Sequence, residues 1–433
     1  MQRASRAAIA LLASTALGAC GAGEGGRGET LQATADTVGG VERILYPGHG
    51  GAHLRWTADT VAVIGGALVE EDAYHFDRVV TDGLASDGAG RLYVLDAAGR
   101  RVLVYDAEGR HVATHGRPGG GPGELAAPSA LAIGPGDSIW VADVGNRRYN
   151  IFPPTGGDAR SIPYPDAAGV AIGPLAVGDD GPIQAFRPFL AVGRDGPMPE
   201  PPRIILRLDG NGSVRDTIWT TPPPQMDEVQ AGNRAQGQVI AIRMSRAFEM
   251  PQLWRRFTDG GFVVADTAEY VLRLLDANGT EVRRIARDLP ARPTTDADKE
   301  LARQRLRDQV RRGGGIRITF SGGGGGGRGA PAPPAPEQLL QAQLDAMTFA
   351  PVIPRITGLR VDTRDRIWVG VSLDEAGATE RIDIYDRAGT LVGEVTGWPL
   401  PDVFLGPDRA AFLTRDDMDV QQIVLVRIVE PEA

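Results

Sequence analysis

The sequence predicts an all-β fold, a six-bladed β-propeller made of four-stranded antiparallel blades. Two observations lead to this prediction. A four-strand pattern recurs along most of the chain, with a period of 40–50 residues where no insertion intervenes, and this is the spacing of propeller blades. The 58 glycines and 32 prolines make up about a fifth of the 433 residues. Such a composition suits many short turns and disfavours a helical bundle.

The clearest copy of the pattern spans 80–116, VTDGLASDGAGRLYVLDAAGRRVLVYDAEGRHVATHG. Its strands are built of alternating β-branched and aromatic residues and are bounded by Gly, Asp and Asn, which are strand and hairpin signals. Further copies span 128–165, 253–287 and 356–396. Two more divergent copies are marked by PIQAFR at 182–187 and AAFLTR at 410–415. The chain therefore holds six units.

The spacing of the units supports repetition and locates insertions. The residues compared end the second strand of each unit: Asp96, Asp143, Arg187, Asp266, Val371 and Arg415. Successive members lie 47, 44, 79, 105 and 44 residues apart. The two long separations predict insertions before the fourth and fifth units.

The sixth unit is incomplete, because the chain ends after two or three of its strands. An unassigned strand, HLRWTADTVAVIG at 53–65, precedes the first full unit. We expect this strand to complete the last blade and close the ring, so that no wide sheet edge stays open. A β-sandwich or an open solenoid is the alternative, and the closing strand makes both less suitable.

Three long segments are expected on one face of the ring: 187–202, 220–252 and 288–354. Each strand of a blade reverses the previous one, so the turn between the second and third strands lies on the same face as the link to the next blade. The long segments all occur at such positions. Loops on a rigid scaffold often carry function, which makes this face the expected working face.

The largest insertion has an organisation of its own. Residues 294–312 predict a helix that begins with a capping pair, Thr295 and Asp298. Residues 313–336 are of low complexity. Residues 336–349 predict a second helix, whose apolar face carries Leu340, Leu344 and Met347. This face is interpreted either as a lid or partner-docking element, or as simple packing on the propeller.

The N-terminus has the three parts of an export signal. Arg3 and Arg6 precede a short apolar stretch at 7–17, and the run ends with Leu-Gly-Ala-Cys at 17–20. This ending resembles the lipobox of bacterial lipoproteins, which implies that 1–19 is removed and Cys20 carries lipid. An ordinary secretory signal with a chance cysteine is the alternative. The absence of Asp after Cys20 favours the outer membrane, with the protein facing the periplasm or the exterior.

The remaining chain divides into a flexible tether at 20–40 and the propeller at 41–433. No segment after Cys20 is long and apolar enough for a transmembrane helix. Within the propeller, GRPGGGPGELAAPSALAIGPGDSIWVADVGNRRYNIF at 116–153 resembles an NHL repeat. The whole arrangement over 41–430 resembles bacterial six-bladed β-propeller lipoproteins, a family of uncharacterised function. The resemblance implies a fold and not a reaction.

Several chemistries are disfavoured. The net charge is −9 and the basic residues are scattered, so a nucleic-acid-binding surface is not indicated. All five histidines lie before residue 116 and cannot supply several blades with metal ligands. The one cysteine is in the lipobox, no Gly-x-Ser-x-Gly motif occurs, and the glycine run 322–327 lacks the sequel of a phosphate loop.

Asp96, Asp143 and Asp266 are candidate metal ligands, because they end equivalent strands on the expected working face. Oxygen ligands from several blades could hold Ca²⁺ near the axis, as in gluconolactonase-like propellers. The other interpretation is structural, since an Asp at a strand end commonly accepts hydrogen bonds from its own turn.

Asn146, Arg147, Arg187 and Arg255 are candidate binding residues. Asn146 and Arg147 follow the NHL pattern and also suit turn or inter-blade contacts. Arg187 and Arg255 are expected to line the mouth of the ring, where arginines bind carboxylate or phosphate. Solvated surface or ion pairing with nearby aspartates is the alternative for both.

These observations favour a lipid-anchored envelope protein that binds or scaffolds a partner without catalysis and without a cofactor. The expected contacts are the membrane, through the lipid, and a protein, peptide or glycan partner of unknown identity. A Ca²⁺-dependent hydrolase or lactonase of the gluconolactonase-like type is the alternative function. An assembly component of an envelope complex is a third interpretation.

Overall fold

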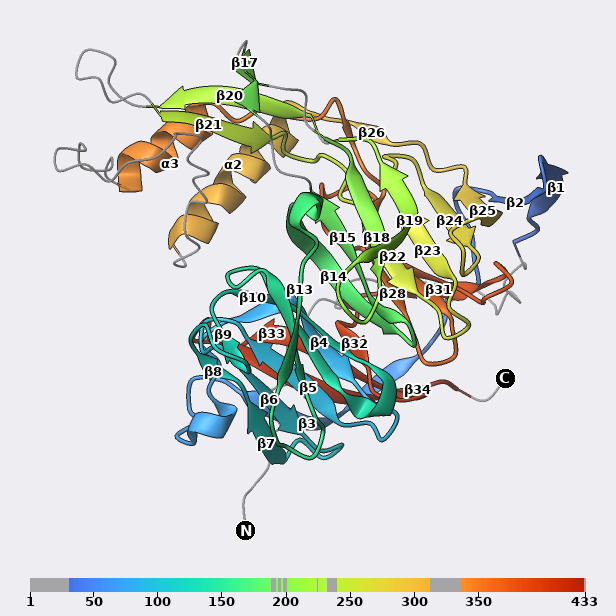
Figure 1. Ribbon diagram of the computed structural model, residues 1–433. Helices are drawn as coiled ribbons and strands as arrows, with labels where there is room; N and C mark the ends of the chain where they lie inside the picture. The colour runs from blue at the N-terminus through green and yellow to red at the C-terminus, as the bar shows by residue number, and fades with distance from the viewer. Residues whose placement is uncertain are drawn as a thin grey trace.

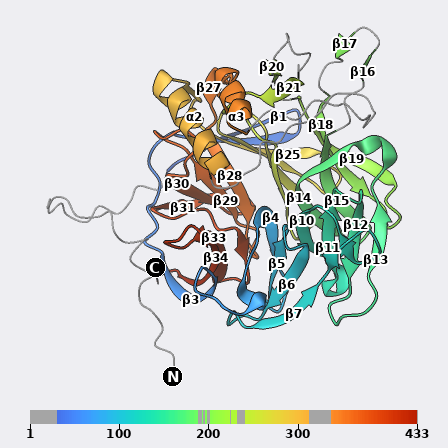
Figure 2. The same cartoon turned by 90° about the vertical axis from the view of Figure 1, so that its left-hand side faces the viewer.

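The protein folds as a ring of six four-stranded antiparallel sheets, which confirms the predicted propeller (Figures 1 and 2). The structure is a computed structural model. It describes residues 31–187, 192–193, 196–197, 201–223, 225–231, 240–311 and 336–431. The predicted signal peptide, Cys20 and the first part of the tether lie outside these residues.

Within each blade the strands are named from the innermost outwards. Blade 1 comprises β4 (Val79–Ser86), β5 (Leu92–Asp96), β6 (Arg101–Tyr105) and β7 (His111–His115). Blade 2 comprises β10 (Pro128–Ile133), β11 (Ile139–Asp143), β12 (Arg148–Phe152) and β13 (Arg160–Pro163). Blade 3 comprises β14 (Val170–Gly178), β15 (Gly181–Arg187), β18 (Arg203–Leu208) and β19 (Val214–Thr221).

Blade 4 comprises β22 (Leu253–Arg256), β23 (Phe262–Ala265), β24 (Val271–Leu275) and β25 (Glu281–Arg287). Blade 5 comprises β28 (Ile356–Val361), β29 (Ile367–Val371), β30 (Arg381–Tyr385) and β31 (Leu391–Thr396). Blade 6 comprises β32 (Val403–Phe404), β33 (Arg409–Arg415), β34 (Gln421–Val429) and β3 (Thr57–Gly65).

The other elements lie in the links and loops. They are β1 (Thr34–Val38), β2 (Val41–Tyr46), β8 (Arg117–Pro118), β9 (Glu124–Leu125), β16 (Val192–Gly193), β17 (Gly196–Pro197), β20 (Met226–Ala231), β21 (Ile240–Ser245), β26 (Arg292–Pro293) and β27 (Val352–Ile353). Three short 3₁₀ turns are η1 (Asp72–Tyr74), η2 (Pro135–Asp137) and η3 (Asp166–Ala168). The helices are α2 (Asp296–Arg311) and α3 (Pro336–Asp345).

The ring closes through the N-terminal strand, as the sequence predicts for 53–65. Strand β3 supplies the outer strand of blade 6 and pairs antiparallel with β34 from Thr57↔Val429 to Gly65↔Gln422. The first blade-forming strand of the chain thus completes the last blade.

The core is distributed between neighbouring blades, because each sheet buries both faces against the next. Between blades 1 and 2, for example, Tyr93 and Leu95 pack with Leu131 and Val141. All four side chains are almost fully enclosed. The strands therefore show runs of buried residues in place of simple alternation, as in β5, β11 and β29.

Six turns on one face share a single construction. In the turn 87–91, Oδ1 of Asp87 accepts hydrogen bonds from the backbone N–H groups of Ala89 (2.9 Å) and Arg91 (3.0 Å), and Gly90 has φ of +76°. Equivalent aspartates begin the turns at Asp106, Asp209, Asp276, Asp362 and Asp386. We call this the plain face, and the opposite face, which carries the long insertions, the elaborated face.

An N-terminal strap wraps three blades, a feature beyond those expected from the sequence. Strands β1 and β2 form a hairpin across Gly39 and Gly40, whose φ values of +60° and +84° suit a two-residue turn. Strand β2 then adds in parallel to β25, at the outer edge of blade 4. The hairpin covers the open outer edge of blade 4. Part of the segment 20–40, expected to be a flexible tether, therefore forms strand β1.

The strap next crosses blade 5 before it enters blade 6 as β3. Leu54 N–H donates to the carbonyl of Glu394 at 2.8 Å, and Glu394 N–H donates to that of Ala52 at 2.9 Å. At Gly48 an added Cβ would lie 2.0 Å from the carbonyl oxygen of Asp288. Glycine is therefore required where the strap passes blade 4.

A buried ion network joins blades 4 and 5. Nη1 of Arg287 lies 2.8 Å from Oδ2 of Asp383 and 2.7 Å from Oε1 of Glu394. The hydroxyl of Tyr270 also donates to Asp383, at 2.8 Å. Burial alone would lower the pKa of Arg287, but the charge of Asp383 and its neighbours raises it above the ordinary value. The cation is therefore held by close counter-charges.

Candidate functional site

The insertions between blades 3 and 4 and between blades 4 and 5 meet on the elaborated face (Figures 1 and 2). Ala247, from the first insertion, donates its backbone N–H to the carbonyl of Thr348 at 2.8 Å and accepts from Ala350 N–H at 2.9 Å. The rings of Phe248 and Phe349 lie 6.4 Å apart between centroids. We call the joined structure, made of β20, β21, α2 and α3 with these connecting residues, the insertion module.

The helices of the module pack on each other and on its hairpin. Helix α3 contacts both α2 and β20. Leu344 is buried and Leu340 and Met347 are half-buried, while the guanidinium of Arg303 lies 5.2 Å from the ring centroid of Phe349. The two predicted helices are confirmed, and the second one packs mainly within the module. Residues 312–335 lie outside the described part of the chain.

A narrow base connects the helical part of the module, α2 and α3, to the ring. Strands β26 and β27 pair through Arg292↔Ile353 and Pro293↔Val352. One step further on, Thr294 N–H donates to the carbonyl of Pro351 at 3.0 Å. The chain therefore leaves the ring for α2 and α3 and rejoins it at adjacent points.

The first turn of α2 forms the predicted capping pair. Asp298 Oδ2 accepts hydrogen bonds from the N–H of Thr295 (2.8 Å) and from its hydroxyl (2.6 Å), and Asp298 N–H donates to that hydroxyl at 3.3 Å. Arg292 also donates to both carboxylate oxygens of Asp298, each at 2.8 Å. These partners, with Arg292 the strongest, hold the pKa of Asp298 well below its usual value.

Asp96 and Asp143 each fasten the end of a second strand to the incoming inter-blade link. Asp96 accepts backbone N–H groups from Arg78 at 2.9 Å and Gly99 at 3.1 Å. Asp143 accepts those of Ala126 at 3.1 Å and Ala127 at 2.9 Å. Both aspartates are fully buried. These contacts support the structural interpretation of the strand-end carboxylates.

Asp266 has a different set of partners at the equivalent position of blade 4. Its Oδ2 accepts from the indole N–H of Trp219 at 2.7 Å and from the hydroxyl of Thr221 at 3.2 Å, both on the outer strand of blade 3. Nε of Arg273 lies 3.5 Å from Oδ1. The three candidate calcium ligands are thus engaged in separate blades. No group of three or more His, Cys, Asp or Glu able to hold a metal ion occurs among the described residues.

Asn146 and Arg147 take part in contacts between segments of blade 2. Nδ2 of Asn146 donates to Oδ2 of Asp143 at 2.7 Å and to the carbonyl of Gly119 at 3.0 Å. Arg147 adopts a left-handed backbone with φ of +52° and donates to the carbonyl of Gly169 at 3.2 Å. Arg187 ends β15, is half-buried, and precedes the first insertion on the elaborated face.

Arg255 lies in the central channel, toward the plain face. Its strand, β22, ends one residue later and turns at 257–261 into β23. The position expected from the sequence, at the mouth with Arg187, is therefore corrected. Nη2 of Arg255 reaches across the ring to Oδ1 of Asp82 in blade 1, at 3.4 Å.

Arg360 and Asp402 complete a channel cluster with Arg255 and Asp82. Nη2 of Arg360 lies 3.6 Å from Oδ1 of Asp402, and Oδ2 of Asp402 accepts the N–H of Leu413 at 2.7 Å. The four charged side chains are 13–23% exposed. Burial raises the pKa of Asp402. The cluster draws on four of the six blades.

Sequence reasoning missed three of these four residues. Arg255 pairs with Val263, and Arg360 pairs with Trp368, at the same register of their blades. Each arginine also precedes the end of its second strand, Asp266 or Val371, by 11 residues. A strict alignment of the repeats would therefore have found Arg360, whereas the contact of Asp82 across the ring depends on closure.

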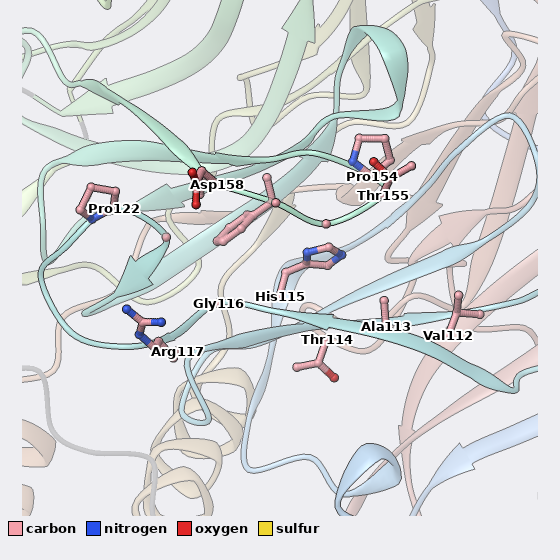
Figure 3. Close-up of a pocket in the computed structure, with 15 residues that line it drawn as sticks. Val112, Ala113, Thr114, His115, Gly116, Arg117, Pro122, Pro154, Thr155 and Asp158 are labelled. Carbon is pink, nitrogen blue, oxygen red and sulfur yellow. The ribbon is translucent and has the colours of Figure 1, made fainter.

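A separate cleft lies between the outer parts of blades 1 and 2 (Figure 3). Its volume is about 620 Å³, and the consecutive residues 112–117 form one wall. Pro154, Thr155 and Asp158 line the opposite wall. The imidazole of His115 points between the walls, and its buried Nε2 has no hydrogen-bond partner among the described residues. Burial lowers the pKa of His115.

Comparisons with known proteins find similarity among solved structures alone. No protein-family model matches the chain, and no curated protein matches it. Among solved structures, a Bacteroides fragilis protein described as exported shares 12% identity, with a TM-score of 0.46, covering 89% of this chain and 99% of its own.

Two further solved structures illustrate the range of similar folds. A DUF4221 family member from Bacteroides vulgatus shares 10% identity and has a TM-score of 0.46, with 87% of this chain and 99% of its own covered. The aldose sugar dehydrogenase of Streptomyces coelicolor, in its PQQ-bound form, shares 12% identity and has a TM-score of 0.39, with 87% and 99% covered. At these values the likenesses carry no argument about function.

Proposed function

We propose that the protein is a lipid-anchored, extracytoplasmic propeller that binds a protein or peptide partner through the insertion module. The observation that carries the proposal is the construction of the module. Segments from two different links join through Ala247, Thr348 and Ala350 into one body on one face. A passive loop needs no such assembly, whereas a binding surface needs a defined shape.

The charged outer surface of α2 favours binding of a polar partner. The side chains of Arg307 and Arg311 are 38% and 77% exposed, and they pair with Glu300 and Asp308 on the same helix. Solvent-accessible pairs of this kind contribute little stability and are readily exchanged for charges on a partner. Within the described residues no helix is both long and apolar enough to cross a bilayer.

The anchoring part of the proposal rests on the lipobox-like run that ends at Cys20. The Cys20→Ser variant is expected to lose incorporation of an alkyne-tagged fatty acid and to leave the membrane fraction. Retention of the label in this variant would overturn lipid attachment at Cys20. The outer membrane is the proposed location, on the sequence that follows Cys20.

The binding part is tested by removing the helical part of the module, α2 and α3, and leaving the β20–β21 hairpin in place. Residues 295–350 are excised, and Thr294 is joined to Pro351 through Asn-Gly, which extends the β26–β27 ladder as a two-residue hairpin. The ring should keep its own cooperative thermal transition. A partner crosslinked and purified with the intact chain from its native envelope should be lost with the excised chain.

A second variant keeps the whole module and alters only its surface. Arg307→Glu and Arg311→Glu together reverse charge at solvent-accessible positions of α2 without touching its buried contacts. We expect weaker capture of the same partner and an unchanged thermal transition. Equal capture by the intact, excised and charge-reversed chains would overturn the proposal.

A further inference from the structure

The channel cluster contains two arginines whose counter-charges are distant. Arg255 makes two hydrogen bonds, one to its neighbour's carbonyl at Trp254 (2.8 Å) and one to Asp82 at 3.4 Å. Arg360 donates from Nη1 to the carbonyl of Leu359 (3.0 Å) and from Nε to the backbone carbonyl of Asp402 (3.1 Å), and its Nη2 approaches the carboxylate of Asp402 only to 3.6 Å. Strong charge-assisted hydrogen bonds are shorter, at about 2.7–2.9 Å.

Arg287 is an example, in the same protein, of an arginine whose charge is closely matched by carboxylates. Its carboxylate partners lie at 2.7 and 2.8 Å, and they raise its pKa despite burial. For Arg255 the direction is opposite: burial, followed by the like charge of Arg360, lowers the pKa to about 9. The channel therefore holds cationic groups that its own carboxylates do not fully neutralise.

The arrangement is built by the repeat itself. Arg255 and Arg360 occupy the same register position on the inner strands of adjacent blades, so their side chains project into the channel from neighbouring directions. In blade 1 the pairing register shifts between Val79 and Leu84. Asp82 lies within this irregular stretch, and bulges of this kind re-aim side chains.

We propose that the channel binds the oxyanion group, a carboxylate or a phosphate, of a small anionic ligand between the guanidinium groups of Arg255 and Arg360. An oxyanion there would accept N–H bonds from both arginines, in the geometry for which guanidinium is suited. Partial exposure of all four charged side chains leaves the cluster in contact with solvent. The site is separate from the insertion module.

The experiment titrates the full-length mature protein with sodium phosphate and, separately, with sodium malonate, each against sodium chloride of equal ionic strength. Isothermal calorimetry measures affinity, and the thermal transition is followed in parallel. A saturable response to either oxyanion supports the proposal, and the responding arm gives the ligand class. The absence of saturable binding of both overturns it.

Two variants are expected to change the affinity for the oxyanion in opposite directions, so a folding defect cannot explain both results. Arg255→Gln should weaken binding about tenfold or more, because one cation is lost. Asp82→Asn should strengthen binding several-fold, because it removes a competing carboxylate. Weaker binding in Asp82→Asn would overturn the assigned role of the cluster.

Arg364→Gln is the matched control, since Arg364 lies in a plain-face turn of blade 5 and pairs with Glu430 outside the channel. Its affinity for the oxyanion should equal that of the natural protein. The chain with residues 295–350 excised should also bind the oxyanion normally. Loss of partner capture with retained oxyanion binding would separate this site from the function proposed for the module.

Discussion

Ile64 in the N-terminal strand β3 is paired with Ile423 in β34, and both side chains are almost completely buried. This pairing joins segments from opposite ends of the chain. The ring is therefore closed by noncovalent contacts of one strand, and its stability should depend on the buried face of that strand.

Replacing Ile64 by Ala should lower the free energy of unfolding by about 2–5 kcal/mol, since it leaves a cavity in the core between blades 6 and 1. Val61 on the same strand is 38% exposed, so Val61→Ala serves as the control and should change stability by less than about 1 kcal/mol. Denaturant unfolding measures both. Equal effects would show that closure does not depend on the packed face.

The buried network around Arg287 gives a second prediction. Arg287→Met should destabilise the protein by about 3–5 kcal/mol, because the buried carboxylates of Asp383 and Glu394 would keep only Arg381 as a counter-charge. The double variant Arg287→Met, Asp383→Leu should recover part of this loss, since it leaves one arginine, Arg381, beside one carboxylate, Glu394. Chemical denaturation of the three proteins is the measurement. A double variant less stable than Arg287→Met would contradict this explanation.

The strand-end carboxylates predict how the protein responds to calcium. Asp143→Ala should cost about 1–3 kcal/mol, because the N–H groups of Ala126 and Ala127 lose their acceptor. Since Asp143 is occupied by protein donors, the loss should be the same with millimolar Ca²⁺ and with chelator. A calcium-dependent rise in melting temperature that Asp143→Ala abolishes would instead support the hydrolase alternative.

Asp298 predicts how the insertion module responds to acid. Its pKa in the folded protein is lowered, chiefly by Arg292, relative to an unfolded value of about 3.9. The stability it supplies is therefore complete above about pH 4 and decreases as the pH falls from there toward the folded pKa. Hydrogen exchange in α2 should increase over this acidic range while the blades stay protected.

Asp298→Asn is the matching variant, since it removes the carboxylate but keeps the side-chain volume. Its α2 should already exchange faster at neutral pH, and the acid-dependent increase should be smaller than in the natural protein. An unchanged acid response in Asp298→Asn would show that another group controls the module.

The sequence was sufficient to predict the blades because the hydrogen bonds that form their turns are local. An aspartate that accepts backbone N–H groups two and four residues later, as Asp87 does, fixes a hairpin from five residues. The closing strand at 53–65 was predictable too, since an incomplete sixth unit required it. The capping pair of Thr295 and Asp298 was likewise a local signal.

Sequence patterns could not predict the contacts that depend on the geometry of the ring. The turn Gly39–Gly40 between alternating segments signals a hairpin, but nothing local indicates that β2 adds in parallel to β25. The contact of Arg255 with Asp82 links opposite blades and exists only after closure. The expected position of Arg255 at the mouth was wrong because Arg255 lies one residue before the end of β22 that turns into β23, on the plain face.

The N-terminal strap also determines how the molecule carries a mechanical load. A pull on the N-terminus acts first on the hairpin β1–β2 at the edge of blade 4, and next on the contacts of Ala52 and Leu54 with Glu394 in blade 5. Only after both have detached does tension reach β3. Blade 6 is thus shielded from forces applied to the N-terminal end of the strap, and the ring can stay closed while the strap is stretched.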